Sequence, residues 1–358
     1  MIGTAVILTS VLLMSGCGPP DEFYSYKFGS TSASSTHYAA AVVLANIINR
    51  ENPDIKIHVV ETGATHDNLV KTQAGELDGG FATNWDGMAM AHDGTTMNEY
   101  IAYGEWTDLR TLPGYLHTYV YVVIVNGGDE EESEGVEPVY EIETLYDLHG
   151  RRFSAGVAGS VTEFNIRRQF EALGIEPEWV SASYADVIEM ARNGEIVGFA
   201  RGSADGKLDS SMLDLHAEVG IEILGWPEED LGTVLAATPG TSATWIPQDA
   251  IEGLPMPGFY TLGYTTGVFV TTDIPQDVGY RMVKAYVDGW GEFANAWPAA
   301  GNWTPLETDL ALLGELIARV EVPPLHAGVV QLMVEKGYEV PPALIGPEYD
   351  ENESNNVD

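Results

Sequence analysis

Two segments of the chain repeat one order of features: a short strand, a turn rich in Gly, Ser and Thr, and a helix. In the first segment the strand YSYKFGS leads into the turn Ser30–His37 and a helix predicted over Tyr38–Asn49. In the second segment, residues 151–175 contain a strand, the turn Gly156–Thr162 and a helix. Strands and helices continue to alternate after both turns. This pattern predicts an α/β protein with two lobes and mainly parallel sheets.

The same alternation predicts the other elements. Strands are expected over 55–62, 78–84, 116–128, 178–183, 196–206 and 264–273, and helices over 65–75, 85–94, 185–195, 276–297 and 326–337. Thr65 is the predicted N-cap of its helix. The strand over 264–273 is predicted to pair with residues 119–126 where the chain crosses between the lobes. The acidic run at 127–138 predicts a solvated surface insertion.

The charge balance is strongly acidic. The chain has 54 Asp and Glu against 16 Lys and Arg, a formal net charge of −38. This balance argues against a nucleic-acid partner, because phosphate binding needs clustered Lys and Arg. At about 1 M salt the Debye length is roughly 3 Å, so salt would screen most of the self-repulsion. We interpret the composition as adaptation to a very salty solvent, with an ordinary acidic secreted protein as the alternative.

The N-terminal residues predict export. The apolar run Ala5–Met14 is too short to span a bilayer and is followed by small residues and the only cysteine, Cys17. The letters LMSGC resemble a lipobox, which predicts a signal peptide over 1–16 and a lipidated tether over 17–22. No Lys or Arg precedes the apolar run, a departure that a misplaced start codon would explain. A single cysteine excludes an internal disulfide.

Sequence motifs of catalytic, metal and cofactor sites are absent. The sequence has no HExxH, no Cys/His cluster, no GxSxG and no GxxxxGK[ST] or GxGxxG loop. The letters GVAGSV, at 156–161, only echo a dinucleotide-binding loop. We therefore expect a binding protein without cofactor or metal, and keep a hydrolase as an alternative.

The two hydroxyl-rich turns predict an anion site. Each turn joins the carboxyl end of a strand to a helix N-terminus, where free backbone N–H groups and the helix dipole favour carboxylate or phosphate. Two such turns facing each other would hold one small anion from both sides. The alternative is that these residues only cap helices and form turns.

The order of motifs resembles the TAXI group of TRAP transporter solute receptors. The resemblance rests on GSTSASSTHYAAAVVLANIIN, VVETGATHDNLVKTQAGELDGGFATNWDGMAMAHDG, LYDLHGRRFSAGVAGSVTEFNIRRQFEALGI, TTDIPQDVGYRMVKAYVDGWGEFANAWPAA and LHAGVVQLMVEKG, and it covers roughly residues 24 to 338. Two positions depart from the family pattern: His37 stands where an aromatic residue is usual, and Arg201 lies beside a turn that is usually small and apolar.

The resemblance implies a two-lobed, periplasmic-binding-protein-like fold of type II, with the ligand cleft between the lobes. Lobe 1 would comprise 23–124 and 259–345, lobe 2 would comprise 125–258, and an acidic tail over 346–358 would be disordered. It also implies a lipid-anchored, extracytoplasmic and monomeric receptor. The receptor would pass a small carboxylate (a dicarboxylate, a 2-oxo acid or an amino acid such as glutamate) to an ion-gradient-driven permease.

A sensory or ABC-linked binding protein of the same fold is the alternative. The expected ligand-binding residues are Thr31, Ser35, Thr36, Tyr38, Thr65, Asn68, Asn84, Trp85, Gly159, Ser160, Thr162, Glu163, Arg201 and Tyr260.

Overall fold

The computed structural model describes residues 23–94, 96–98, 101–102, 104–125, 142–203, 206–297, 303–318 and 322–349. The predicted signal peptide, the tether with Cys17 and the acidic insertion at 127–138 lie outside these residues. In the described part of the chain, no helix has the length and apolar character needed to cross a membrane.

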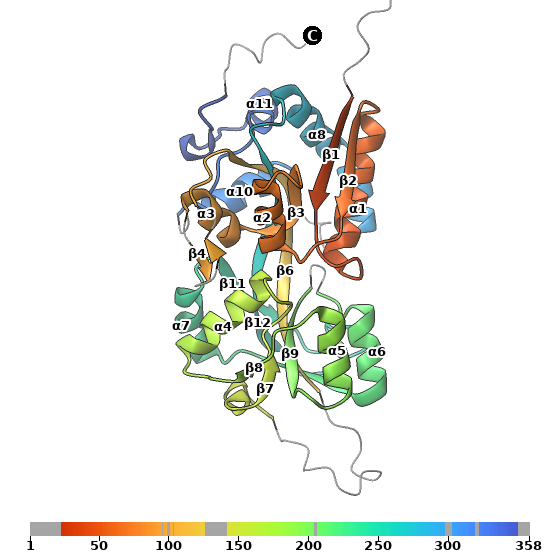
Figure 1. The fold of residues 1–358 in the computed structure, drawn as a ribbon, viewed down its shortest axis with the longest axis vertical. Helices are drawn as coiled ribbons and strands as arrows, with labels where there is room; N and C mark the ends of the chain where they lie inside the picture. Colours follow the sequence, from red (N-terminus) through yellow and green to blue (C-terminus); the bar gives the residue numbers. More distant parts are fainter. Residues whose placement is uncertain are drawn as a thin grey trace, which may run out of the picture.

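One ten-stranded sheet runs through both halves of the molecule (Figure 1). Its strand order is β2-β1-β3-β12-β6-β9-β7-β8, with β10 beside β6 and β11 beside β12. The strands are β1 (Tyr24–Gly29), β2 (Ile55–Val60), β3 (Gly79–Asn84), β6 (Leu109–Val125), β7 (Arg152–Ser154), β8 (Glu178–Trp179), β9 (Gly198–Ser203), β10 (Ile221–Leu224), β11 (Thr241–Ile246) and β12 (Phe259–Thr271). A separate pair is formed by β4 (Thr96–Asn98) and β5 (Ile101–Ala102).

The topology is that of a two-lobed, type II periplasmic-binding-protein fold. In one half β2, β1 and β3 pair in parallel, and β3 is followed by the antiparallel β12. In the other half β8, β7 and β9 pair in parallel, and β9 is followed by the antiparallel β6. Each lobe therefore places its second, first and third strands in that order beside a long strand from the crossover. The long strands β6 and β12 are shared, and they join the lobes.

Two expectations about the sheet need correction. The lobes do not have separate, mainly parallel sheets, because β6 and β12 pair antiparallel with each other and with their neighbours. The strand predicted over 264–273 pairs with residues 109–117 rather than with 119–126. The reason is that β6 begins seven residues earlier than the predicted 116, so its first half stays in lobe 1. The lobe boundaries expected at 124/125 and 258/259 fall at the last residues of β6 and at the start of β12.

Helices cover the faces of both lobes (Figure 1). They are α1 (Thr36–Glu51), α2 (Thr65–Gln73), α3 (Trp85–Asp93), α4 (Val161–Ala172), α5 (Tyr184–Arg192), α6 (Ser210–Val219), α7 (Leu231–Ala237), α8 (Gln276–Asp288), α9 (Trp290–Ala296), α10 (Glu307–Leu316) and α11 (Ala327–Glu335), with 3₁₀ turns at Leu145–Leu148, Glu228–Asp230 and Pro342–Leu344. The helix predicted over 276–297 is divided at Gly289 into α8 and α9. Thr65 is the first residue of α2 and not its N-cap, because Ala64 occupies the cap position with φ of 79°.

Buried residues form two apolar clusters. The larger one surrounds Phe28, Phe81 and Phe269 in lobe 1 and continues through Phe153 and Phe170 into lobe 2. The smaller one lies where α5 and α6 pack against β6 and β9, around Tyr121 and Phe199. Because the larger cluster is continuous across the crossover strands, the two lobes share part of their core.

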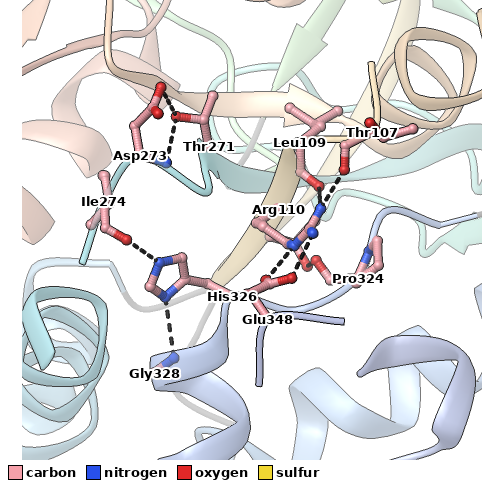
Figure 2. A network of polar contacts seen from close by, with 11 residues as sticks. Thr107, Leu109, Arg110, Thr271, Asp273, Ile274, Pro324, His326, Gly328 and Glu348 are labelled. Carbon is pink, nitrogen blue, oxygen red and sulfur yellow. Dashed lines mark hydrogen bonds and ion pairs between the residues drawn. The ribbon is translucent and has the colours of Figure 1, made fainter. Parts of the chain in front are cut away.

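The C-terminal segment is fastened to lobe 1 (Figure 2). The buried Arg110 of β6 makes a bidentate ion pair with Glu348, at 2.5 Å to Oε1 and 2.7 Å to Oε2, and also donates to the carbonyls of Thr107 and Leu109. The buried His326 bonds to the Ile274 carbonyl oxygen through Nε2 (2.8 Å). The disorder expected over 346–358 therefore does not include 346–349, while 350–358 lie outside the described residues.

Candidate functional site

A cavity of about 230 Å³ lies between the lobes. Its walls come from the turns after β1 and β2, from the turns before α4 and α5, and from the crossover strands. The lining residues are Thr31, Ser32, Ser35, His37, Thr62, Gly63, Ala64, Thr65, Ala82, Val157, Ser160, Val161, Thr162, Ser183, Tyr184, Ala200, Arg201, Gly202, Tyr264 and Thr266. The lining is thus dominated by hydroxyl groups, with several small apolar side chains and one guanidinium.

The turn after β1 brings Thr31 and Ser35 to the lobe 1 wall. Ser35 is the N-cap of α1, and its Oγ accepts from the Tyr38 N–H (3.1 Å) and contacts the Thr31 hydroxyl. Asn68 holds this turn from behind, because its Nδ2 donates to the carbonyls of Ser30 (2.9 Å) and Phe81 (3.2 Å). A Cβ at Gly29 would come within 2.2 Å of the Asn68 Oδ1, so glycine is required there for Asn68 to approach.

The start of α2 supplies a second element of the lobe 1 wall. Its N-cap, Ala64, has no side chain that could accept from the first backbone N–H groups of the helix. Of the four described non-glycine residues with positive φ, two line the cavity, Ala64 and Ala82. Such backbone costs about 1–3 kcal/mol each and is concentrated at functional sites in proteins. The N-terminus of α2, which has no side-chain cap at Ala64, therefore lies at the cavity wall.

Lobe 2 contributes the N-termini of α4 and α5. Ser160 caps α4 by accepting from the Glu163 N–H (3.2 Å), and Ser183 caps α5 by accepting from the Asp186 N–H (3.3 Å). Both serines line the cavity. With α1 and α2, four helices begin at this cavity, two from each lobe. Their positive dipole ends favour an anion between the lobes.

Arg201 is the one charged side chain in the described lining of the cavity. It lies on β9 and is 8% exposed. Its Nε and Nη2 are each 2.9 Å from Oδ2 of Asp209, and its guanidinium stacks 3.6 Å above the ring of Tyr184. Tyr184 also donates to Asp209 (2.8 Å), whose Oδ1 caps α6 at the Met212 N–H (3.0 Å). This cluster fixes the guanidinium plane, and Nη1 has no acceptor among the described residues.

The crossover strands form the base of the cavity. The Tyr264 hydroxyl of β12 is 2.9 Å from Oγ1 of Thr162, and His37 is 2.8 Å from the Thr118 Oγ1 through Nε2. Burial, followed by the nearby Arg201 charge, lowers the pKa of His37 to about 3. Burial also raises the pKa of Tyr264. Both side chains are therefore neutral hydrogen-bonding groups at neutral pH.

Of the fourteen residues expected from sequence, six line the cavity: Thr31, Ser35, Thr65, Ser160, Thr162 and Arg201. Several others lie behind its walls. Thr36 and Tyr38 lie on the first turn of α1, outside the lining. Asn84 caps α3 and Trp85 is a core side chain.

The remaining three expected residues also lie outside the lining. The Gly159 N–H donates to Glu163 (2.8 Å), whose carboxylate also pairs with Arg167. Tyr260 packs edge-on against Trp245 with ring centroids 4.9 Å apart. These contacts give all three residues a structural role outside the cavity lining.

The structure adds lining residues that the sequence analysis did not include, above all His37, Ser183, Tyr184 and Tyr264. The sequence could have predicted Ser183 and Tyr184 at a helix N-terminus, because Ser183 and Asp186 have the spacing of an N-terminal capping motif. His37 stood out only as a departure from the family pattern, and Tyr264 carried no signal, since only the crossing of α1, β6 and β12 brings them to one place. No group of three or more potential metal ligands occurs in the described part of the chain.

Comparisons with known proteins give three kinds of result. No curated protein matches the chain. Solved structures similar to it include a putative L-cystine ABC transporter from Listeria monocytogenes (TM-score 0.45, 11% identity, 79% of this chain and 97% of that one). The periplasmic aliphatic sulphonate binding protein from Escherichia coli aligns with a TM-score of 0.41 (16% identity, 87% and 83%). The GluR0 ligand-binding core from Nostoc punctiforme, solved with L-glutamate, aligns with a TM-score of 0.42 (11% identity, 76% and 98%).

One family model matches most of the chain. It is described as the NMT1-like family and covers residues 28–337, from β1 to the end of α11. The match thus includes both lobes, the crossover strands and every residue that lines the cavity. The chain belongs to the NMT1-like family.

Proposed function

We propose that the protein is an extracytoplasmic solute-binding receptor that holds a small carboxylate between its lobes and performs no covalent chemistry. The observation that carries this proposal is the convergence of four helix N-termini and Arg201 on one interlobe cavity. The fold supports it, because a cleft between two lobes joined by crossover strands can close around a ligand. The closed, ligand-bound state is the one that a membrane partner would recognise.

A hydrolase is less well supported by the contacts. The neutral His37 could act as a base, but its bonded hydroxyl belongs to Thr118, which is fully buried and does not line the cavity. The hydroxyl of Ser35, which lines the cavity, is engaged with Thr31 and with a backbone N–H. Among the described residues, no hydroxyl at the cavity is thus paired with a base in a way that would activate it.

Binding is tested by calorimetry in molar salt with a panel of small carboxylates, after mass spectrometry of whatever co-purifies with the folded protein. Ser35→Ala, Ser160→Ala and Arg201→Ala each remove a lining group, and Thr36→Val is the matched control just outside the lining. Loss of a charge-assisted contact costs about 1.5–3 kcal/mol, which is roughly a tenfold to hundredfold loss of affinity. Folded lining variants that all bind like the parent would place the ligand elsewhere.

We further propose that the receptor serves a TRAP-type permease, on the strength of the TAXI-like motifs. An ABC importer is the alternative partner. Co-purification of the receptor with each candidate membrane component decides between them: a large ion-gradient-driven permease supports the first, and an ATPase-coupled permease supports the second.

We also propose that Cys17 anchors the mature protein to the membrane by a lipid. The motif LMSGC supports this proposal. Cys17→Ser should release the protein from membranes into the medium, which immunoblots of the two fractions would measure. A variant that stays wholly membrane-bound would exclude the anchor.

A further inference from the structure

We infer that the ligand is a small monocarboxylate that carries hydroxyl or oxo groups and lacks an ammonium group. This rests on the proposed function and narrows the solute class from carboxylates in general. The charge inventory of the cavity wall and the arrangement of its neutral groups carry the inference.

The first step concerns ammonium groups. The described lining contains no Asp or Glu, so an α-amino acid would find no carboxylate for its ammonium. Two carboxylates that contact lining residues already have partners there: Asp186 accepts from the Ser183 hydroxyl (2.6 Å) and Asp67 accepts from the Gly63 N–H (2.9 Å). A third, Asp209, lies behind Arg201 and is 7% exposed. Its oxygens already accept from Arg201, Tyr184 and the Met212 N–H. A buried ammonium without a counter-charge is strongly disfavoured, and four helix N-termini add to the repulsion.

The second step concerns the number of carboxylates. Arg201 is the single cation in the described lining, and Asp209 already neutralises part of its charge. The rest of the base is made of His37, Tyr264 and Thr162, all neutral hydrogen-bonding groups. Such groups match hydroxyl or carbonyl oxygens, whereas a second carboxylate there would lie buried without a cation.

The third step concerns size and shape. The cavity of about 230 Å³ lies below the roughly 300–1,000 Å³ that is typical of ligand pockets, so the ligand is small. Val157, Val161, Ala82 and Ala200 add apolar surface to the lining. A carboxylate with one or two oxygen substituents and a short alkyl group fits all three conditions.

The experiment uses sets of compounds that share a carbon skeleton and differ in one group. The three-carbon set is lactate, pyruvate, alanine, lactamide and hydroxymalonate. The five-carbon set is 2-hydroxypentanoate, 2-oxopentanoate, norvaline and 2-hydroxyglutarate. Calorimetry of the purified protein in molar salt measures each affinity. We expect a hydroxy or oxo monocarboxylate to bind at least tenfold more tightly than the amino acid, the amide and the dicarboxylate of the same set.

A variant tests the cause of the preference. Ser160→Asp brings a carboxylate to the cavity wall, and Asp can still cap α4. The affinity ratio of hydroxy acid to amino acid should fall at least tenfold in this variant. Ser242→Asp, on the exposed side of β11 and away from the lining, adds the same charge and should leave the ratio unchanged.

The outcomes distinguish a failure of this inference about the ligand from a failure of the proposed receptor function. Equal or tighter binding of an amino acid or a dicarboxylate would overturn this inference and leave the carboxylate receptor intact. Binding of lactamide as tightly as lactate would overturn both, because the anion would then be unnecessary. Failure of the folded protein to bind any carboxylate would likewise overturn the proposed function, and this inference with it.

Discussion

Arg201 and Asp209 form a buried ion pair in which one carboxylate oxygen lies 2.9 Å from both Nε and Nη2 of the guanidinium. The pair joins the end of β9 to the N-cap of α6, and Tyr184 lies against both residues. The carboxylate thus positions the guanidinium and also reduces its net charge. A ligand anion and Asp209 would therefore share one cation.

Because the cation is shared, we expect Asp209→Asn to lower the stability of the free protein and to increase the stabilisation that an anionic ligand provides. Removing one partner of a buried pair costs about 3–5 kcal/mol, so the free variant should unfold at lower temperature. A ligand carboxylate about 4 Å from Arg201 gains up to about 4 kcal/mol at an effective dielectric constant of 20. Without Asp209 the Arg201 side chain is less fixed, and ordering it when the ligand binds costs only about 2 kcal/mol. The Coulomb gain is larger than this entropy cost, so we expect the ligand to stabilise the variant more than the parent.

The measurement is the rise in melting temperature on saturation with the best ligand from the panel. We expect a larger rise for Asp209→Asn than for the parent. Arg201→Met removes the guanidinium, and with it both the attraction for the anion and the positioning by Asp209. It is the control and should show little rise in melting temperature. A smaller rise for Asp209→Asn than for the parent would mean that positioning by Asp209 matters more than the shared charge.

Asp309 predicts an unusual pH dependence of stability. Its carboxyl is fully buried at the start of α10. Oδ2 accepts from the Leu306 N–H at 2.9 Å, and Oδ1 has no hydrogen-bond partner among the described residues. Burial raises the pKa of Asp309 to about 7, against 3.8 for an ordinary Asp, although the Leu306 hydrogen bond opposes this. Between these two pH values the folded state holds a proton that the unfolded chain has released. Stability from this group is thus full below about pH 4 and falls as pH rises through 7.

Asp309→Asn removes the charge and keeps an oxygen that can accept from Leu306. The variant should match the parent near pH 4 and exceed it at pH 8 by up to about 4 kcal/mol, the equivalent of about three pKa units. Denaturant unfolding at both pH values in the same high salt measures the difference. The exposed Asp214→Asn removes the same charge elsewhere and corrects for general repulsion. A gain for Asp309→Asn that is equal at pH 4 and pH 8 would contradict the argument.

The Arg110–Glu348 pair predicts that the C-terminal segment stabilises lobe 1. Arg110 is 3% exposed, so Glu348→Gln would leave a buried guanidinium without its counter-charge. Because the Glu348 side chain is itself 31% exposed, solvent should reduce the cost to about 1–3 kcal/mol. Thermal melts of the parent and of Glu348→Gln measure it. Glu335→Gln, a change of an exposed residue on α11, is the control, and an equal loss in both would show that Arg110 does not depend on the pair.

Features of the fold and of the site that depend on residues close together in the sequence were predictable, whereas features that depend on contacts between distant residues were not. The turns at 30–37 and 156–162 were predictable, because hydroxyls before a helical pattern are a local signal. Arg201 was noticed as an unusual residue beside a turn. Asp209 was not, since its role arises only when β9 and α6 pack. The antiparallel crossover was misjudged for the same reason: residues 109–115 include Pro113 and Gly114, which argue locally against a strand.

The last prediction concerns salt. The full chain has a formal net charge of −38, and several ion pairs of the fold, such as Arg50–Glu292 and Lys284–Asp288, have both side chains about half exposed. Pairs of this kind contribute at most about 1 kcal/mol each, too little to offset repulsion among so many unpaired carboxylates. Salt at about 1 M shortens the Debye length to roughly 3 Å, which removes most of the repulsion and leaves short-range contacts such as Arg201–Asp209 nearly intact. We therefore expect the melting temperature to rise steeply from dilute buffer to several molar KCl. Tetramethylammonium chloride at matched ionic strength should have a similar effect if screening is the cause. A melting temperature unchanged across this range would exclude adaptation to a salty solvent.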